Sequence, residues 1–242
     1  MRLNEHTAIA TPRVTLVPYE ARHVERYHEW MSDLDIQEAT ASEPLTLEEE
    51  YENQQSWRTS HDKLTFIICQ PLSTPATADL SDREHGMVQA GEVDASELMI
   101  GDINFFIYPN DDDEADENGG SYVGEVDIMV AAKNHRGKGV GYAAVTTLLT
   151  YVHQNKERIL KEYVEGEGMN GGIVPVLKGL MVKIKEGNVA SIALFRRLGF
   201  TQKGEVNYFG EIQMVLEDFD QFVASPAGAT AAGEYHEAVY SR

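Results

Sequence analysis

The 242-residue chain has a single cysteine, two tryptophans and no long hydrophobic run. Cys69 cannot form a disulfide within the chain, and because it lies in an apolar, strand-like stretch we expect it to be a small core residue. No apolar run is long enough to span a bilayer, and the first residues lack the basic and then hydrophobic order of a signal peptide. These absences predict a soluble, cytoplasmic protein with no membrane partner.

Basic residues are also scarce. The chain carries 20 Lys and Arg against 40 Asp and Glu, for a formal net charge of -20. The excess lies in residues 1–121, with 7 basic and 26 acidic residues, whereas residues 122–242 hold 13 and 14. Such an acidic chain repels nucleic acid, and it contains no basic stripe with interleaved aromatic residues. Nucleic acid is therefore not an expected partner.

The near-neutral half contains a glycine-rich stretch, residues 134–144, which reads Asn-His-Arg-Gly-Lys-Gly-Val-Gly-Tyr-Ala-Ala. Glycines let the backbone take positive φ and approach a ligand closely, and the free N–H groups at a helix N-terminus bind anions. Arg136 and Lys138 add positive charge beside these donors. The stretch predicts a site for a diphosphate group.

The flanking sequence predicts a strand before the glycines and a helix after them. Residues 122–131 alternate as in a half-buried strand, whose acidic face is formed by Glu125, Asp127 and Met129. Beyond the glycines, apolar residues recur at helical spacing, at Val145, Leu148, Leu149 and Val152.

Two other glycine motifs follow a strand in proteins. A P-loop is excluded because no Gly-Lys-Ser/Thr ends the run. Residues 139–144 do match the dinucleotide pattern Gly-x-Gly-x-x-Ala. However, residues 132–138 separate the strand from that pattern, and the next apolar run begins near Leu177 and carries Lys183 and Lys185 where an acidic residue is expected. A glycine turn without a ligand fits poorly with alternate glycines flanked by two cations.

Residues 136–141, Arg-Gly-Lys-Gly-Val-Gly, resemble the Gln/Arg-x-x-Gly-x-Gly/Ala signature of the GCN5-related N-acetyltransferases. Residues 188–200 resemble the Asn-x-x-Ser…Gly-Phe block of the ribosomal-protein-acetylating type of this family. Four segments of the first part of the chain are similar to the N-acetyltransferase 9-like branch, at residues 16–19, 27–31, 40–51 and 63–67. The resemblance covers about residues 1–218.

This resemblance implies an α/β (α+β) fold, with a mixed, mostly antiparallel sheet, flanking helices and acetyl-CoA at a splayed central strand pair. Residues 1–222 are expected to form one domain with loop insertions at about 71–97 and 109–121, and residues 223–242 a flexible tail. The acidic run in the second insertion lacks the EF-hand spacing, so we expect a solvated loop and no metal site.

Periodicity and capping signals predict the remaining elements. Strands are expected at residues 13–18, 63–69, 98–108, 179–185, 200–206 and 211–216. Helices are expected at residues 20–31, 46–57 and 188–199, of which the second begins with the capping box of Thr46 and Glu49 and the third with Asn188.

The resemblance also implies the cofactor contacts. The pantetheine arm would lie along the backbone of residues 128–130, the pyrophosphate would occupy residues 136–141, and Asn188 and Ser191 would lie near the thioester. The expected acetyl-CoA contacts are Ile128, Met129, Val130, Arg136, Gly137, Lys138, Gly139, Val140, Gly141, Tyr142, Asn188 and Phe195.

Acetyl transfer to an amine needs a group that removes a proton from the amine. Glu125 is the first candidate, and Asp127 on the same strand face is the second, since two nearby carboxylates raise each other's pKa. Many members of the resembled family have a tyrosine seven residues after the asparagine to protonate the leaving thiolate. Here that position is Phe195, so Ser191 is the candidate that stabilises the thiolate.

The leading hypothesis is an acetyl-CoA-dependent N-acetyltransferase that acts on a protein or peptide amine by direct attack in a ternary complex. One alternative keeps the fold but makes the protein a CoA-binding interaction module with little turnover. A remote alternative is a nucleotide-binding oxidoreductase. The motifs do not specify the acceptor or the oligomeric state, because the acceptor-selecting segments of this family lie in the N-terminal part.

Overall fold

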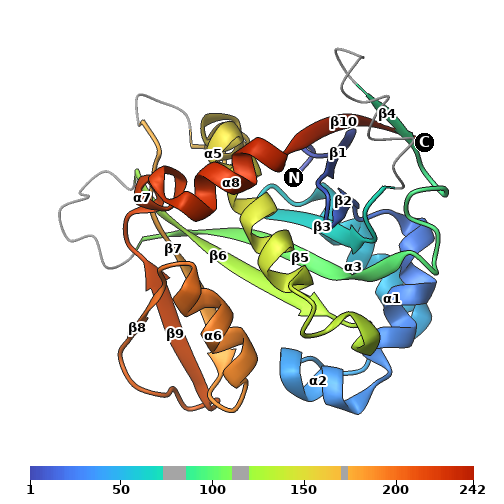
Figure 1. Ribbon diagram of the computed structural model, residues 1–242, viewed down its shortest axis with the longest axis horizontal. Helices are drawn as coiled ribbons and strands as arrows, with labels where there is room; N and C mark the ends of the chain where they lie inside the picture. Colours follow the sequence, from blue (N-terminus) through green and yellow to red (C-terminus); the bar gives the residue numbers. More distant parts are fainter. Residues whose placement is uncertain (73–85, 111–119, 170–173) are drawn as a thin grey trace.

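A ten-stranded sheet runs through the molecule, with helices on both faces (Figure 1). The computed structural model describes residues 1–72, 86–110, 120–169 and 174–242. The strands are β1 (Thr7–Ala10), β2 (Thr15–Pro18), β3 (Lys63–Cys69), β4 (Met87–Gln89), β5 (Met99–Pro109), β6 (Ser121–Val130), β7 (Val176–Lys185), β8 (Thr201–Lys203), β9 (Glu211–Leu216) and β10 (His236–Ser241). The helices are η1 (Ala21–His23), α1 (Val24–Met31), α2 (Leu34–Thr40), α3 (Leu47–Thr59), η2 (Lys133–His135), α5 (Val140–Gly166), α6 (Val189–Arg197), α7 (Phe219–Ala224) and α8 (Pro226–Glu234).

The strand order is β4-β10-β1-β2-β3-β5-β6-β7-β9-β8. Neighbouring strands are antiparallel except for two parallel pairs, β10 with β4 and β6 with β7. A mixed, mostly antiparallel sheet with flanking helices is the fold expected from the sequence, and this expectation is confirmed.

The alternation of side chains along the central strands builds one core on each face of the sheet. On β3, Leu64, Phe66 and Ile68 pack into the core that includes α5, whereas Ile67 and Cys69 pack into the core that includes α1 and α2. Cys69 is fully buried, and burial raises the pKa of its thiol well above the ordinary value. It is the core residue expected from the sequence.

The predicted helix ends are confirmed by their hydrogen bonds. Thr46 and Glu49 form the reciprocal capping box at the start of α3. Asn188 caps α6, where its side-chain oxygen accepts a hydrogen bond from the N–H of Ser191. Gly199, just after α6, has φ of +93°, which suits the left-handed end of a helix.

The prediction of a flexible tail at residues 223–242 is wrong. Ser225 caps α8, whose first residue is proline, and α8 packs against α5. The chain then enters the sheet as β10, between β1 and β4 (Figure 1). Ala238 and Tyr240 of this strand are buried. The alanine- and glycine-rich composition of α8 suggested disorder, although Ser-Pro at its start and the alternation in β10 are signals of order.

The two predicted insertions lie partly outside the described residues. In the first, residues 73–85 are not described, whereas residues 87–89 form β4 at the sheet edge, so this part is not the loop that was expected. In the second, residues 111–119 are not described, and the expectation of a solvated loop concerns these residues. The strands β1 and β4 and the short helix α2 were not predicted, because each is short.

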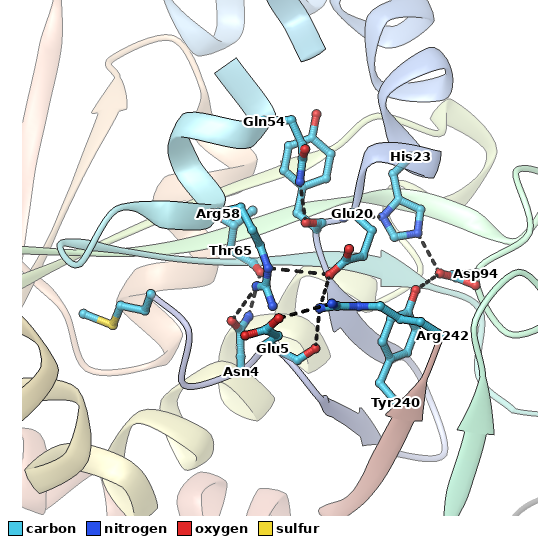
Figure 2. A network of polar contacts seen from close by, with 12 residues as sticks. Asn4, Glu5, Glu20, His23, Gln54, Arg58, Thr65, Asp94, Tyr240 and Arg242 are labelled. Carbon is cyan, nitrogen blue, oxygen red and sulfur yellow. Dashed lines mark hydrogen bonds and ion pairs between the residues drawn. The ribbon is translucent and has the colours of Figure 1, made fainter. Parts of the chain in front are cut away.

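Polar contacts tie β10 to the first part of the chain (Figure 2). Asp94 accepts hydrogen bonds from the ring of His23, at 2.7 Å, and from the hydroxyl of Tyr240. Arg242 donates to Glu20 at 2.9 Å and to Glu5 at 3.2 Å. The end of the chain is therefore held by a buried contact to Asp94 and by surface contacts to Glu5 and Glu20.

Asp94 should make stability sensitive to acid. Burial opposes ionisation of its carboxyl, but hydrogen bonds from His23 and Tyr240 outweigh it and lower the pKa to about 2. Because this lies below the unfolded value of about 4, ionised Asp94 stabilises the fold above pH ~4, and about 2.5 kcal/mol is lost as pH falls towards 2. Urea unfolding of the protein and of Asp94→Asn between pH 6 and 3 measures this. Asp220→Asn, at an exposed carboxylate, is the control. If the free energy of unfolding falls with pH in the same way for the protein and for Asp94→Asn, Asp94 is not the group responsible.

Candidate active site

The central parallel strands β6 and β7 separate part-way along their length. Their pairing runs from Ser121 opposite Val176 to Glu125 opposite Met181. Beyond this point, residues 126–130 of β6 continue to pair with β5, and residues 182–185 of β7 continue with β9. The two strands therefore diverge and leave an opening between them, which is the splayed pair expected from the sequence.

The glycine-rich stretch closes one end of this opening. Gly139 is the N-cap residue of α5 with φ of +82°, and Gly137 has φ of +72°, so both adopt the backbone conformation that favours glycine. No side chain caps α5, and its first hydrogen bond runs from the N–H of Ala143 to the carbonyl of Gly139. The preceding N–H groups remain available for an anion.

Gly141 faces into the opening. A Cβ atom at this position would lie 3.5 Å from Leu194 on α6 and 3.9 Å from Ile128 and Val130 on β6. The start of α5 thus lies against the strand residues predicted to hold the pantetheine arm. A larger side chain at Gly141 would fill this space.

The cations at the site are arranged differently from the sequence prediction. Arg136 donates from Nε to the carbonyl of Val130 at 2.8 Å and from Nη2 to that of Ala131 at 3.4 Å, so it fixes the loop to the end of β6. Arg13 approaches residues 137–141, which we call the cradle: its Nη1 lies 3.5 Å from where a Cβ of Gly139 would be. Lys138, between Gly137 and Gly139, is exposed. Sequence reasoning missed Arg13, since no local pattern links it to the glycines.

Two predicted contacts lie elsewhere than expected. Phe195 is only 2% exposed and packs edge-on against Phe200 in the core, so its side chain is not at the surface of the opening. The side chain of Val140 is also buried, which leaves its N–H as the group facing outward. Tyr142 is half-buried beneath Arg197, whose guanidinium lies 4.3 Å from the ring centroid and adds a further cation near the start of α5.

On α6, Asn188 and Ser191 lie together at the helix start, as the sequence predicts. The Oδ1 atom of Asn188 is used in capping, and it accepts from the N–H of Ser191 at 3.2 Å. The hydroxyl of Ser191 is separate from this bond and half-buried.

The acidic strand face lies on the other side of β6. Glu125 pairs with Lys183 of β7 at 2.8 Å. Asp127 is exposed to solvent, yet protein surrounds it closely enough that desolvation, with the charge of Glu125, raises the pKa of its carboxyl. An open recess of about 600 Å³ adjoins this face and is lined in part by Tyr108, Met181 and Lys183.

Two polar residues that the sequence reasoning missed lie next to Asp127. Asn104 of β5 pairs directly opposite it, and Asp102 lies one pleat further along on the same face. Both side chains are buried, and Asn104 donates to Asp102 at 2.7 Å. Burial and the charge of Asp127 raise the pKa of Asp102 to about 8. The signal was present as polar residues at alternate positions in an apolar strand.

An acetyltransferase (GNAT) domain model matches residues 13–201. The chain belongs to this family. The GNAT enzyme is 37% identical over 214 residues to the alpha/beta-tubulin-N-acetyltransferase 9 of Drosophila melanogaster, covering 88% of each chain. It is 36% identical over 217 residues to an N-acetyltransferase 9-like protein of Caenorhabditis briggsae, covering 89% of this chain and 88% of that one. These relatives confirm an N-acetyltransferase of the branch predicted from the sequence.

Solved structures confirm the fold of the GNAT enzyme. The spermidine N-acetyltransferase of Vibrio cholerae, solved in complex with CoA and spermine, has a TM-score of 0.57 at 15% identity and covers 87% of this chain and 98% of that one. Because the chain belongs to the GNAT family, the alternative of a nucleotide-binding oxidoreductase is set aside.

Neither a membrane span nor a metal cluster is found in the part of the chain that the structure describes. None of its helices combines the length and the apolar character needed to cross a bilayer. Nor do His, Cys, Asp and Glu side chains of these residues gather in groups of three that could hold a metal ion.

Gly141→Val should abolish CoA binding while the fold is retained, because the side chain would occupy the space between α5, α6 and β6. Calorimetric titration with CoA measures the affinity, and circular dichroism checks the fold. Gly233→Val is the matched control, since a Cβ there meets no atom within 4 Å. Gly139→Val is a less clean test, because positive φ strains a β-branched residue. Unchanged CoA affinity in folded Gly141→Val would refute the site.

Proposed function

We propose that this GNAT enzyme transfers the acetyl group of acetyl-CoA to an amine of a protein acceptor, with α- and β-tubulin as the first candidates. The observation that carries the proposal is the divergence of β6 from β7, with an anion-binding helix start at one side and an acidic, open strand face at the other. The names of the relatives supply the candidate acceptor.

The residues around the opening fit the chemistry of CoA. The N–H groups at the start of α5 would bind the pyrophosphate, and Arg13 and Lys138 would add positive charge. The backbone of Ile128, Met129 and Val130 would pair with the pantetheine arm, because the edge of β6 that faces β7 is released from pairing there. Acetyl-CoA supplies the activated acetyl group in this arrangement.

Direct attack requires the acceptor amine to reach the thioester in neutral form. Asp127 is the better candidate for the base, because it is solvent-accessible and its pKa is raised, which brings its proton affinity closer to neutral pH. Glu125, the first candidate from the sequence, is held in an ion pair with Lys183, so its carboxylate is less free to contact an acceptor amine.

The test of the activity is incubation of the full chain with acetyl-CoA and αβ-tubulin, with intact-protein and peptide mass spectrometry of the product. Acetylation of tubulin that depends on enzyme and is absent in Gly141→Val is the expected result. If tubulin remains unmodified while a library of unrelated protein amines is acetylated, the acceptor assignment is wrong and the transferase assignment stands. If neither tubulin nor the library is acetylated, the proposed function is refuted.

The choice between the two carboxylates is tested by Asp127→Asn and Glu125→Gln. We expect Asp127→Asn to lower kcat by roughly 10²-fold or more, in the range of general-base catalysis, and Glu125→Gln to lower it much less. Steady-state kinetics with a verified acceptor measure both. A larger loss of kcat in Glu125→Gln than in Asp127→Asn would assign the general base to Glu125.

Ser191 is proposed to hydrogen-bond the leaving thiolate, because Phe195 has no proton to give and lies in the core. A CoA thiol is only moderately basic, so Ser191→Ala should lower kcat by less than the ~10²–10⁴-fold typical of acid–base steps, and should weaken acetyl-CoA binding less than it slows turnover. Rates and affinities are measured side by side. An unchanged kcat would exclude this role.

A further inference from the structure

A row of polar side chains crosses three strands on the face of the sheet that carries Asp127. Thr65 of β3 lies directly opposite Asn104 of β5, and Asn104 lies directly opposite Asp127 of β6. Asp102 is a diagonal neighbour of Asp127, roughly 7–8 Å away for such a pair. Three of these residues are enclosed: Asp102 is 2% exposed, Asn104 1% and Thr65 8%.

The buried part of this row is not fully hydrogen-bonded. Asn104 donates one hydrogen bond to Asp102, but within the described residues Oδ1 of Asp102, Oδ1 of Asn104 and Oγ1 of Thr65 are enclosed and have no partner. Buried polar groups are nearly always paired, because an unpaired one costs about 1–3 kcal/mol. Unpaired polar residues at this cost, next to Asp127, the proposed base, indicate a chemical role.

The neighbours of Asp102 make a second negative charge costly. From β6 it faces Asp127, with Glu125 beyond, and each of these carboxylates disfavours ionisation of the next. The other titratable groups near the row are the hydroxyls of Tyr27 on α1 and Tyr19 before η1, and the carboxyl of Glu50 on α3, which itself faces His28. Tyr27 responds to both aspartates, whose charges add to burial in raising its pKa. Asp102 and Asp127 thus share one environment.

We propose that Asp102 and Asp127 act as one base, in which Asp127 touches the acceptor amine and the buried Asp102, fixed by Asn104, is a positioning residue that raises the proton affinity of the pair. This inference rests on the proposed transfer to an amine. Two carboxylates in one low-dielectric environment titrate as a pair, and the pair holds one proton near neutral pH because both cannot ionise freely.

The proton balance follows from this pairing. The acceptor enters as an ammonium ion, and its positive charge lets the pair lose its proton to solvent. An N–H bond of the ammonium then breaks and its proton goes to Asp127, while the electron pair stays on nitrogen and attacks the thioester carbon. The C–S bond breaks, the second nitrogen proton passes to the departing sulfur, and CoA leaves as the thiol. The pair ends with one proton, as it began.

The pairing is tested by carbon-13 NMR titration of the carboxyl carbons in the full chain labelled at aspartate, without any substrate. In the unmodified protein, Asp102 should titrate near pH 8. Asp127→Asn, at an exposed position, should lower the midpoint of Asp102 by about one unit, because it removes the negative charge that opposes ionisation of Asp102. A midpoint of Asp102 that stays in place in Asp127→Asn would show that the two carboxylates are not coupled.

Asp94→Asn is the matched control, because it makes the same change at another buried carboxylate and should leave both midpoints in place. The titration needs only the unmodified protein and Asp127→Asn, so it decides the question even if the variant Asp102→Asn, used for kinetics below, does not fold. A midpoint for Asp102 below pH 5, or independent titration of the two residues, would overturn the proposal.

The pH dependence of kcat/KM distinguishes a failure of this inference from a failure of the proposed function. With a verified acceptor, Asp102→Asn should lower kcat/KM at pH 7 by roughly 10-fold and shift the acidic limb of its pH profile to lower pH, with CoA affinity unchanged. An unchanged profile would refute the role of Asp102 while leaving acetyl transfer intact. Absence of acetyl transfer from the unmodified protein would refute the proposed function, and coupled NMR titration would still show the pair.

Discussion

The separation of β6 from β7 after Glu125 is the constraint on which the rest of the site depends. Up to that residue the two strands satisfy each other's backbone groups, and beyond it each is paired only on its outer side. An unpaired strand edge inside a protein needs another partner. In the proposed function, the amide groups of the pantetheine arm would supply those hydrogen bonds.

The two faces of β6 carry side chains of different chemistry. One face holds Ile128 and Val130 against the glycine start of α5. There the backbone N–H groups lie close to Arg13, which comes from a different part of the sequence. The other face carries Asp127 above the buried pair of Asp102 and Asn104. Because side chains alternate along a strand, a single segment can present its backbone to a cofactor and its carboxylates to an amine. In the proposed function, cofactor and acceptor would approach from opposite sides of the same residues.

The N-terminal helices and the C-terminal strand stabilise this arrangement from outside. The helices α1 and α3 cover the acidic side of the sheet, and η1, which precedes α1, is tied through His23 and Asp94 to Tyr240 of β10 (Figure 2). The end of the chain therefore supports the helices that cover the strand face with Asp127. Its place within the sheet explains why two apolar residues of β10 are fully packed.

The sequence alone determined the elements with strong local signals. The capping box of α3, the Asn188 cap of α6, the apolar stripe of α5 and the glycines at positive φ are all encoded within a few residues, because each depends on backbone geometry or helical spacing. The cradle residues 137–141 were predictable for the same reason. Short strands such as β1 and β4 were not, since three or four residues carry too little periodicity.

Only the tertiary structure decided which residues meet. Arg13 reaches the cradle, Lys183 engages Glu125, Arg136 turns back to Val130, and Asp102 lies below Asp127, and each contact joins residues that no local pattern connects. The order of β10 was likewise decided by packing, since burial of Tyr240 and Ala238 outweighs the weak propensity of the segment before them. Charge and proton affinity depend on distance and burial in three dimensions, so the choice between Glu125 and Asp127 could not come from the sequence.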